Sequence, residues 1–389
     1  MTIRIKALRI KTPRINTTLA ALALALSAGH ALADINVGVV FSLTGPAASL
    51  GAETRKAIEF MPATLGDEKI NYIVLDDATD PTNAVKNARK LVGEDKVDAI
   101  IGPNLITNGM AMVDVANEAK VPMLSIAPID PAADKRAWAF RVEPTADIMV
   151  GRVVEDLKAK GVKTVGFIGF SDSWGELLLK ALTSTTQAAG IKIVATERYA
   201  RTDTSVTGQA LKVLSARPDA VFVGGSGTPA ALPQTVLRER GYKGPIYQSH
   251  AVANKEFLRL GGKNVEGARL PVAPVLVAEQ LPDGHPNKAA GVAFLQQLEG
   301  KLGADSRSTF AGAAYDAGLL LENAMKSAIK TAKPGTPEFR EGIRKALEST
   351  SGLVGVNGTY TLSAEDHGGY DPKAVVLIEV ANGKWSLVK

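Results

Sequence analysis

The chain has 389 residues, no cysteine and a formal net charge of +5. Five of its 45 basic residues and none of its 40 acidic residues lie in the first 33 positions, so the rest of the chain is formally neutral. A neutral chain without a basic patch has no electrostatic basis for binding nucleic acid, and the lack of cysteine excludes disulfides, thiol nucleophiles and thiolate-held metals.

The first 33 residues have the pattern of a secretory signal peptide. A basic stretch up to Asn16 is followed by the apolar run Leu19 to Leu26, and the segment ends on Ala31-Leu32-Ala33. An Ala-x-Ala end after a short apolar run is a cleavage site, whereas a membrane-spanning helix needs about 20 apolar residues. We therefore expect cleavage after Ala33 and export to the periplasm.

After residue 34, short apolar runs alternate with segments of helical period. The predicted strands are 35–41, 70–75, 97–101, 122–126, 164–168, 191–196, 220–223, 246–248, 358–362 and 375–380. The predicted helices are 52–65, 83–92, 108–119, 151–159, 176–188, 205–214, 230–240, 287–301, 309–330 and 337–347. Strand–helix alternation indicates parallel sheets covered by helices, and its restart near residue 151 indicates two α/β units in tandem.

The motifs that enzymes use are absent or incomplete. The loop Gly224 to Gly227 follows a strand but is not a dinucleotide-binding GxGxxG, and no GxSxG nucleophile elbow occurs. The three histidines after residue 34, His250, His285 and His367, lie too far apart for a metal motif. The pair Asp76-Asp77 at a strand end has no companion ligands. We therefore expect a binding protein rather than an enzyme, with no metal and no cofactor.

Several segments, in this order along the chain, resemble the Leu/Ile/Val-binding family of type I periplasmic solute-binding proteins. They are VGVVFSLTGPAASLGAETRKAIE (37–59), LDDATDPTNAVKNARKLV (75–92), IIGP (100–103), VPMLSIAP (121–128), FRVEPT (140–145), SDSWG (171–175) and AAYDAGLLL (313–321). The resemblance implies two doubly wound α/β lobes joined by a three-crossover hinge that closes on a ligand. It places lobe I at 34–146 and 277–357, and lobe II at 147–276 and 358–389.

The resemblance also implies which residues face the ligand. The implied set is Ser42, Leu50, Asn104, Ile106, Thr107, Ala127, Ile129, Trp174, Ser226, His250 and Phe310. Within it, Thr107 is the hydroxyl expected to hold a carboxylate, as the N-cap of a helix whose free N–H groups attract anions. Thr107 as an N-cap with no ligand role remains an alternative. Trp174 and Phe310 are expected either to offer flat faces to the ligand or to belong to the core.

The amine side departs from the family pattern. The family holds the ligand's ammonium with a backbone carbonyl, a threonine and a glutamate, and those positions fall here on Ala127, Ile129 and His250. An ammonium buried without a carboxylate partner is costly. The sequence therefore favours a ligand without an α-amino group, such as an aromatic acid of the benzoate or cinnamate type. His250 is expected to donate to, or pair its charge with, a carboxylate or phenol, and a surface or hinge position is the alternative.

We expect the protein to be a monomer that delivers a small carboxylate to the permease of an ABC importer. Two alternatives remain open at this point. One is a receptor for branched-chain amino acids or amides with a rearranged amine site. The other is a ligand-sensing domain that signals to a membrane kinase.

The signal peptide gives the first testable prediction. Mass spectrometry of the protein recovered from the periplasm should show Asp34 as the N-terminal residue, because Ala31-Leu32-Ala33 forms the cleavage site. Recovery of the uncut chain from the cytoplasm would contradict export.

Overall fold

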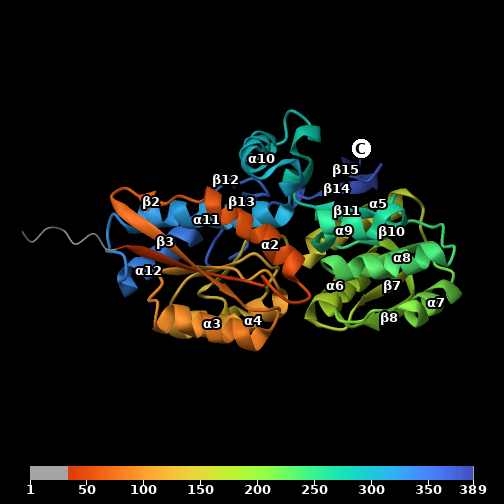
Figure 1. The fold of residues 1–389 in the computed structure, drawn as a ribbon, viewed down its shortest axis with the longest axis horizontal. Helices are drawn as coiled ribbons and strands as arrows, with labels where there is room; N and C mark the ends of the chain where they lie inside the picture. Colours follow the sequence, from red (N-terminus) through yellow and green to blue (C-terminus); the bar gives the residue numbers. More distant parts are fainter. Residues whose placement is uncertain (1–33, 389) are drawn as a thin grey trace, which may run out of the picture.

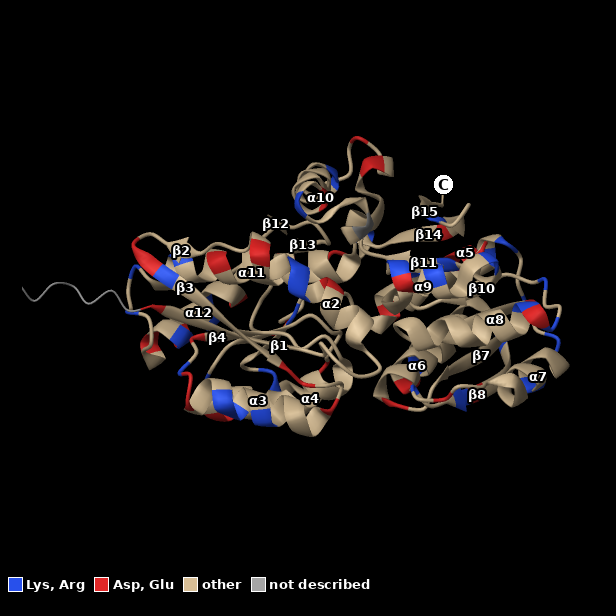
Figure 2. Ribbon diagram, viewed as in Figure 1, with Lys and Arg blue, Asp and Glu red and all other residues tan. Residues whose placement is uncertain are grey.

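The computed structural model describes residues 34–388, so the predicted signal peptide lies outside the described residues. Two α/β units lie side by side along the long axis of the molecule, and helix α10 (Lys288–Leu302) sits above the region where they meet (Figure 1). Charged residues of both signs are interspersed over both units (Figure 2).

The first unit is built on a six-stranded sheet of order β2-β3-β1-β4-β5-β6. Its strands are β1 (Ile35–Phe41), β2 (Thr64–Leu65), β3 (Glu68–Asp76), β4 (Ala99–Ile101), β5 (Met123–Ser125) and β6 (Ala139–Arg141), all parallel except β2. Its helices are α2 (Ala48–Lys56), α3 (Pro81–Gly93), α4 (Ile106–Ala119), α11 (Thr309–Ala328) and α12 (Pro337–Glu348). Strand β1 is apolar along nearly its whole length because helices cover both faces of the sheet.

The second unit is built on a seven-stranded sheet of order β15-β14-β11-β10-β9-β7-β8. Its strands are β7 (Thr164–Phe170), β8 (Lys192–Tyr199), β9 (Ala220–Gly224), β10 (Ile246–Gln248), β11 (Arg269–Val272), β14 (Val376–Ala381) and β15 (Lys384–Leu387), with β14 and β15 antiparallel to their neighbours. Its helices are α5 (Ala146–Ala159), α6 (Ser173–Ala189), α7 (Thr207–Ser215), α8 (Ala231–Glu239) and α9 (Lys255–Gly261). The predicted class, two mostly parallel sheets flanked by helices, is confirmed.

Some predicted elements differ from the observed ones. The predicted helix 52–65 begins earlier, ends in a 3₁₀ turn (Ala57–Phe60) and gives way to β2, because Met61 precedes Pro62 and takes an extended conformation. The predicted strand 358–362 is a two-residue strand, β13 (Thr359–Tyr360), paired with β12 (Leu353–Val354). The short elements β6, α9, β11 and β15 escaped prediction because three or four apolar residues carry little periodicity.

The chain passes between the two units three times. The first passage joins β6 to α5, the second leads from β11 to α11, and the third leads into β14. The expected boundary at 358 is too early, because Tyr360, Leu362 and Tyr370 are buried in the same apolar cluster as β1 and α12. The third passage therefore falls just before Val376, where the chain joins the second sheet.

Helix α10 belongs to neither unit alone. Leu295 and Leu298 pack in an apolar cluster with residues of β11 and β14, which are strands of the second sheet. Phe294 also contacts Phe60 and Tyr315 of the first unit, at ring-centroid distances of 6.2 and 4.6 Å. The helix thus bridges the two units above the second passage, and the expected boundary near residue 276 is a shared region.

Two glycines bring a helix close to the end of a strand, one in each unit. A Cβ at Gly51 in α2 would overlap the carbonyl oxygen of Ser42, and a Cβ at Gly175 in α6 would overlap that of Phe170. These close approaches fix the first turns of α2 and α6, which carry Leu50 and Trp174.

The close approach at Gly175 gives a prediction for stability. Gly175→Ala should lower the free energy of unfolding by at least about 2 kcal/mol, because the added methyl group forces backbone atoms apart. The matched control is Gly151→Ala in α5, where a Cβ meets no atom within 4 Å. That substitution should be neutral or stabilise by up to about 1 kcal/mol through helix propensity. Urea denaturation measures both, and equal effects would contradict the packing argument.

Candidate functional site

A small pocket lies between the two units, and its empty space of about 330 Å³ includes space open to solvent. The lining residues are Leu50, Asn104, Leu105, Ile106, Ile126, Ala127, Pro128, Trp174, Arg201, Ser226, His250, Ala251 and Phe310. Most of them follow the carboxyl ends of parallel strands, where open α/β sheets bind ligands.

The pocket forms where the strand order of each sheet reverses. In the first sheet the order reverses between β1 and β4, and Leu50 and Asn104 follow those strands. In the second sheet it reverses between β7 and β9, and Trp174 and Ser226 follow those strands. At such a point neighbouring connections leave on opposite faces of the sheet and open a crevice. The two crevices face one another, and together they make the pocket.

The rims of the two units touch. A Cβ on Gly227, which follows β9, would lie 2.7 Å from Cδ1 of Leu50 in α2. Leu50, Trp174 and Phe310 also belong to one apolar cluster that continues from the first unit into the second. The arrangement is therefore closed around the pocket.

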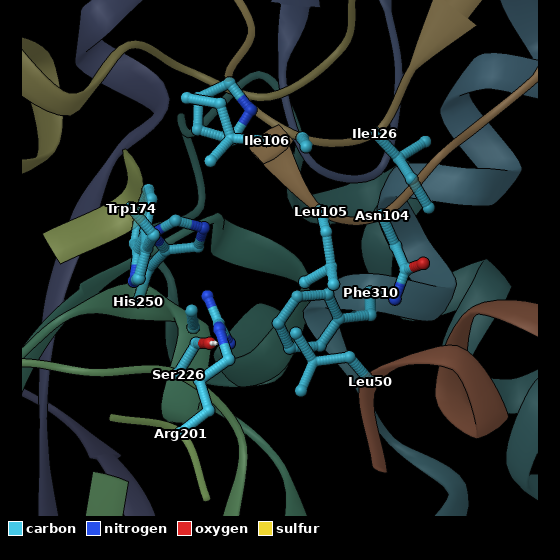
Figure 3. Close-up of a pocket in the computed structure, with 13 residues that line it drawn as sticks. Leu50, Asn104, Leu105, Ile106, Ile126, Trp174, Arg201, Ser226, His250 and Phe310 are labelled. Atoms are coloured by element: carbon cyan, nitrogen blue, oxygen red, sulfur yellow. Dashed lines mark hydrogen bonds between the residues drawn. The ribbon is translucent and has the colours of Figure 1, made fainter. Parts of the chain in front are cut away.

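Flat and branched apolar side chains form the walls. Figure 3 shows Trp174 and His250 on one side of the pocket and Leu50 and Phe310 on the other. Trp174 is held in place because its Nε1 donates a hydrogen bond to the carbonyl oxygen of Gly225 (3.0 Å). Its ring is 4% exposed, and Phe310 is 3% exposed. The indole face is thus a fixed surface on which a planar group can stack.

Arg201 supplies the positive charge of the pocket. Its Nε donates to Asp172 Oδ2 (2.5 Å), one terminal nitrogen donates to Ser226 Oγ (2.6 Å), and the guanidinium lies 4.3 Å from the ring centroid of Phe170. A guanidinium has five N–H donors, so donors remain after these two bonds. Asp172 also caps α6 by accepting from Trp174 N and Gly175 N. The guanidinium is thus held in a fixed orientation that suits a carboxylate.

Asn104 is a second polar group with unused capacity. Its Oδ1 accepts from Ser42 N (2.8 Å), whereas its buried Nδ2 has no partner. It comes just before α4, whose N-cap residue Leu105 makes no side-chain cap bond. The free N–H groups of that first turn and the amide of Asn104 attract an anion.

His250 faces the pocket in its neutral form. Complete burial lowers its pKa to about 3. Its Nδ1 is buried without a hydrogen-bond partner, and its Nε2 lies 3.8 Å from Oε2 of Glu143. Burial, with a smaller effect of the nearby Asp316, raises the pKa of Glu143 to about 8, so this carboxyl is mostly protonated at neutral pH. A neutral His250 favours hydrogen bonding to a ligand over the charge pairing that the sequence also allowed, and Arg201 is the cation among the lining residues.

Eight of the residues expected to face the ligand line the pocket. They are Leu50, Asn104, Ile106, Ala127, Trp174, Ser226, His250 and Phe310. Ser42, Thr107 and Ile129 do not line it. The backbone carbonyl of Ala127 already accepts from Ile129 N (2.7 Å) and Ser125 Oγ (3.0 Å).

The expected role of Thr107 as a helix N-cap is wrong. The helix begins at Ile106, two residues before the predicted start at Asn108, so Thr107 lies within the first turn, and its hydroxyl bonds to Asn108 Oδ1 (3.2 Å). Ser42 acts behind the wall instead: its hydroxyl donates to Asp77 Oδ1 (2.6 Å) and its backbone N–H holds Asn104. Ile129 packs towards α4 beside Gly109.

Sequence reasoning missed Arg201 altogether. The predicted strand stopped at residue 196, whereas β8 continues to Tyr199, so Arg201 comes directly after the carboxyl end of a strand. Strands β7 and β9 each place a polar or aromatic residue on the wall just after their ends. Extending β8 over the alternating residues Thr196 to Tyr199 is the signal that would have pointed to Arg201.

No group of three His, Asp or Glu side chains is placed to hold a metal ion in residues 34–388. Over the same part of the chain, no helix has the length and apolar character needed to cross a bilayer. The fold and the site define a two-lobed binding protein that holds a small ligand in the cleft between its lobes.

The chain belongs to the periplasmic binding protein family, whose model matches residues 34–384. It is similar to Rp1789 of Rhodopseudomonas palustris strain CGA009, with 44% identity, a TM-score of 0.90, and coverage of 92% of this chain and 100% of that one. It is 26% identical to Leu/Ile/Val-binding protein homolog 3 of Brucella melitensis biotype 1, over 86% of this chain and 89% of the relative. An ABC-transporter solute-binding protein of R. palustris in complex with benzoate has the same fold, with 20% identity, a TM-score of 0.77, and coverage of 92% and 96%.

Proposed function

We propose that this protein captures a small aromatic carboxylate in the periplasm and delivers it to the permease subunits of an ABC importer. The observation that carries the proposal is the charge of the pocket wall. Of the thirteen lining residues, one, Arg201, is a cation and none is acidic. Asp172 pairs with Arg201 from behind the wall, so the preference for an anion rests on the remaining N–H donors of the guanidinium and on the lack of a lining acid.

Binding of an amino acid would carry an additional free-energy cost for burying its ammonium group. Its carboxylate fits the same donors, but its ammonium needs a carboxylate or several carbonyl oxygens once water is removed. The acid nearest to His250, Glu143, is itself mostly protonated, and the carbonyl of Ala127 already accepts two hydrogen bonds. A buried ammonium in this pocket would have to ionise Glu143 against its burial and the charge of Asp316, and this cost disfavours leucine, isoleucine and valine.

The shape of the pocket favours a planar ligand body. The ring of Trp174 on one wall and that of Phe310 on the other give a flat group two aromatic neighbours. Aliphatic side chains from Leu50 and Ile106 complete an apolar surround for a ring.

The alternative is a receptor for branched-chain amino acids. It is favoured by the names of curated relatives such as the Leu/Ile/Val-binding protein homolog of Brucella. A protein of the same fold binds benzoate, so the fold accommodates either ligand class. Sequence identities of 26% and 20% do not discriminate between the two ligand classes, so the preference for either class rests on the pocket residues.

Isothermal titration calorimetry of the protein lacking residues 1–33 tests the proposal. Benzoate or cinnamate should bind, and leucine, isoleucine and valine should give no heat, because the pocket lacks an ionised acid for the ammonium. Micromolar binding of leucine by the wild-type protein would overturn the proposed ligand class in favour of the alternative.

Arg201→Met tests which group holds the carboxylate. Loss of a charge-assisted hydrogen bond should weaken the aromatic acid by about 1.5–3 kcal/mol, roughly a 10- to 150-fold increase in Kd. The matched control is Arg198→Met in β8, the strand that precedes Arg201, since Arg198 is 43% exposed and pairs with Glu176 instead of lining the pocket. Its affinity should equal that of the wild type. An unchanged Kd in Arg201→Met would remove Arg201 from the site.

A further inference from the structure

A buried acid and a buried histidine face one another across the first passage between the lobes. Glu143 lies in the short segment between β6 and α5, and His250 follows β10 of the second sheet. Oε2 of Glu143 is 3.8 Å from Nε2 of His250, and the two residues are only 4% and 6% exposed. His250 lines the pocket and Glu143 does not. Glu143 therefore reaches the ligand only through His250.

The groups around Glu143 cannot neutralise a negative charge on it. Asp316 of α11 repels such a charge. Burial raises the pKa values of Tyr360 and Tyr370, and a negative charge on Glu143 raises them further. No Lys or Arg is among the groups that perturb the pKa of Glu143. The guanidinium of Arg141, two residues away, bonds instead to the carbonyl of Ile129 (3.0 Å).

Asp316 acts only as a hydrogen-bond acceptor. It accepts hydrogen bonds from Val356 N (2.7 Å), Asn357 N (2.8 Å) and the hydroxyl of Tyr360 (2.8 Å). Three donors stabilise the ionised form of a carboxyl. Of the two adjacent buried acids, Asp316 is the one built to hold the negative charge, which leaves the proton with Glu143.

The two ring nitrogens of His250 have opposite surroundings. Nε2 faces Glu143, whereas Nδ1 is buried without a hydrogen-bond partner. The ring is fixed edge-on to Trp174, with centroids 5.4 Å apart. A neutral imidazole carries its single hydrogen on one nitrogen, and the partner of the other nitrogen decides which. A hydrogen bond from Glu143 to Nε2 would therefore make the protonation of Glu143 decide whether Nδ1 is a donor or an acceptor.

We propose that Glu143 is the positioning residue of the binding pocket: as a neutral acid it donates its proton to a hydrogen bond with Nε2 of His250, so that Nδ1–H donates to an oxygen of the bound carboxylate. The 3.8 Å separation is longer than a hydrogen bond, so the proposal requires a small movement that brings Oε2 of Glu143 and Nε2 of His250 within hydrogen-bond distance. The proposal rests on the proposed function, an anionic ligand in this pocket.

Ionisation of Glu143 reverses this arrangement. An ionised carboxylate accepts from Nε2–H, which leaves a lone pair on Nδ1 where the ligand oxygen lies, and it adds a negative charge behind the pocket wall. Binding of the anion and loss of the Glu143 proton then oppose one another, so affinity falls as pH rises past the pKa of about 8. Below pH 7 the affinity stays constant.

Titration calorimetry with cinnamate between pH 6 and 10 tests this, because cinnamate has no group that titrates in that range. The wild-type Kd should be flat from pH 6 to 7 and then rise, approaching about tenfold per pH unit above pH 8, with uptake of up to one proton on binding. Glu143→Gln, which cannot ionise, should remove both the rise and the proton uptake. The matched control Glu176→Gln, an exposed acid on α6, should keep them.

The ¹⁵N resonances of His250 give a readout that needs neither ligand nor a stable Glu143 variant. In the wild type they should show the Nδ1–H tautomer at pH 6 and the Nε2–H tautomer above pH 9, with His250→Gln used to assign the signals. A wild-type Kd that is flat to pH 10, or one tautomer throughout, would overturn the role of Glu143. If cinnamate fails to bind at every pH while the tautomer switches, the proposed ligand class fails and the acid–histidine pair stands.

Discussion

The site depends on one constraint of parallel sheets: side chains placed after strand ends meet at the carboxyl edge, and a crevice opens only where the strand order reverses. Each lobe has one such reversal, between β1 and β4 and between β7 and β9. Three passages of the chain hold the two edges face to face, so a pocket between them draws on both sheets. Gly51 and Gly175 let α2 and α6 begin close to those edges, which brings Leu50 and Trp174 onto the wall.

Charge decides what such a pocket accepts. Asp172, Ser226 and the ring of Phe170 fix the Arg201 side chain. Its remaining donors can therefore bind a ligand with little further loss of conformational entropy. Glu143, the acid beside His250, keeps its proton because burial and Asp316 both disfavour its charge. A receptor for zwitterions needs an ionised acid where this protein has a neutral histidine. The difference between the two ligand classes is thus carried by very few atoms.

The sequence was sufficient for the fold, because long alternating segments such as 35–41 and 309–330 carry a strong periodicity. It was sufficient for eight wall residues, since the resemblance aligned the strand ends. It was insufficient where a shift of two residues matters: Thr107 was taken for the N-cap of a helix that begins at Ile106. Arg201 and Glu143 were missed because their roles depend on what surrounds them in space, which neither spacing nor composition records.

The most direct measurement is a crystal structure of the protein with a bound aromatic carboxylate. The account predicts a carboxylate within hydrogen-bond distance of Arg201 and of Nδ1 of His250, with the ring between Trp174 and Phe310. A carboxylate that avoids Arg201, or an amino acid found in the pocket with its ammonium on an ionised Glu143, would contradict it.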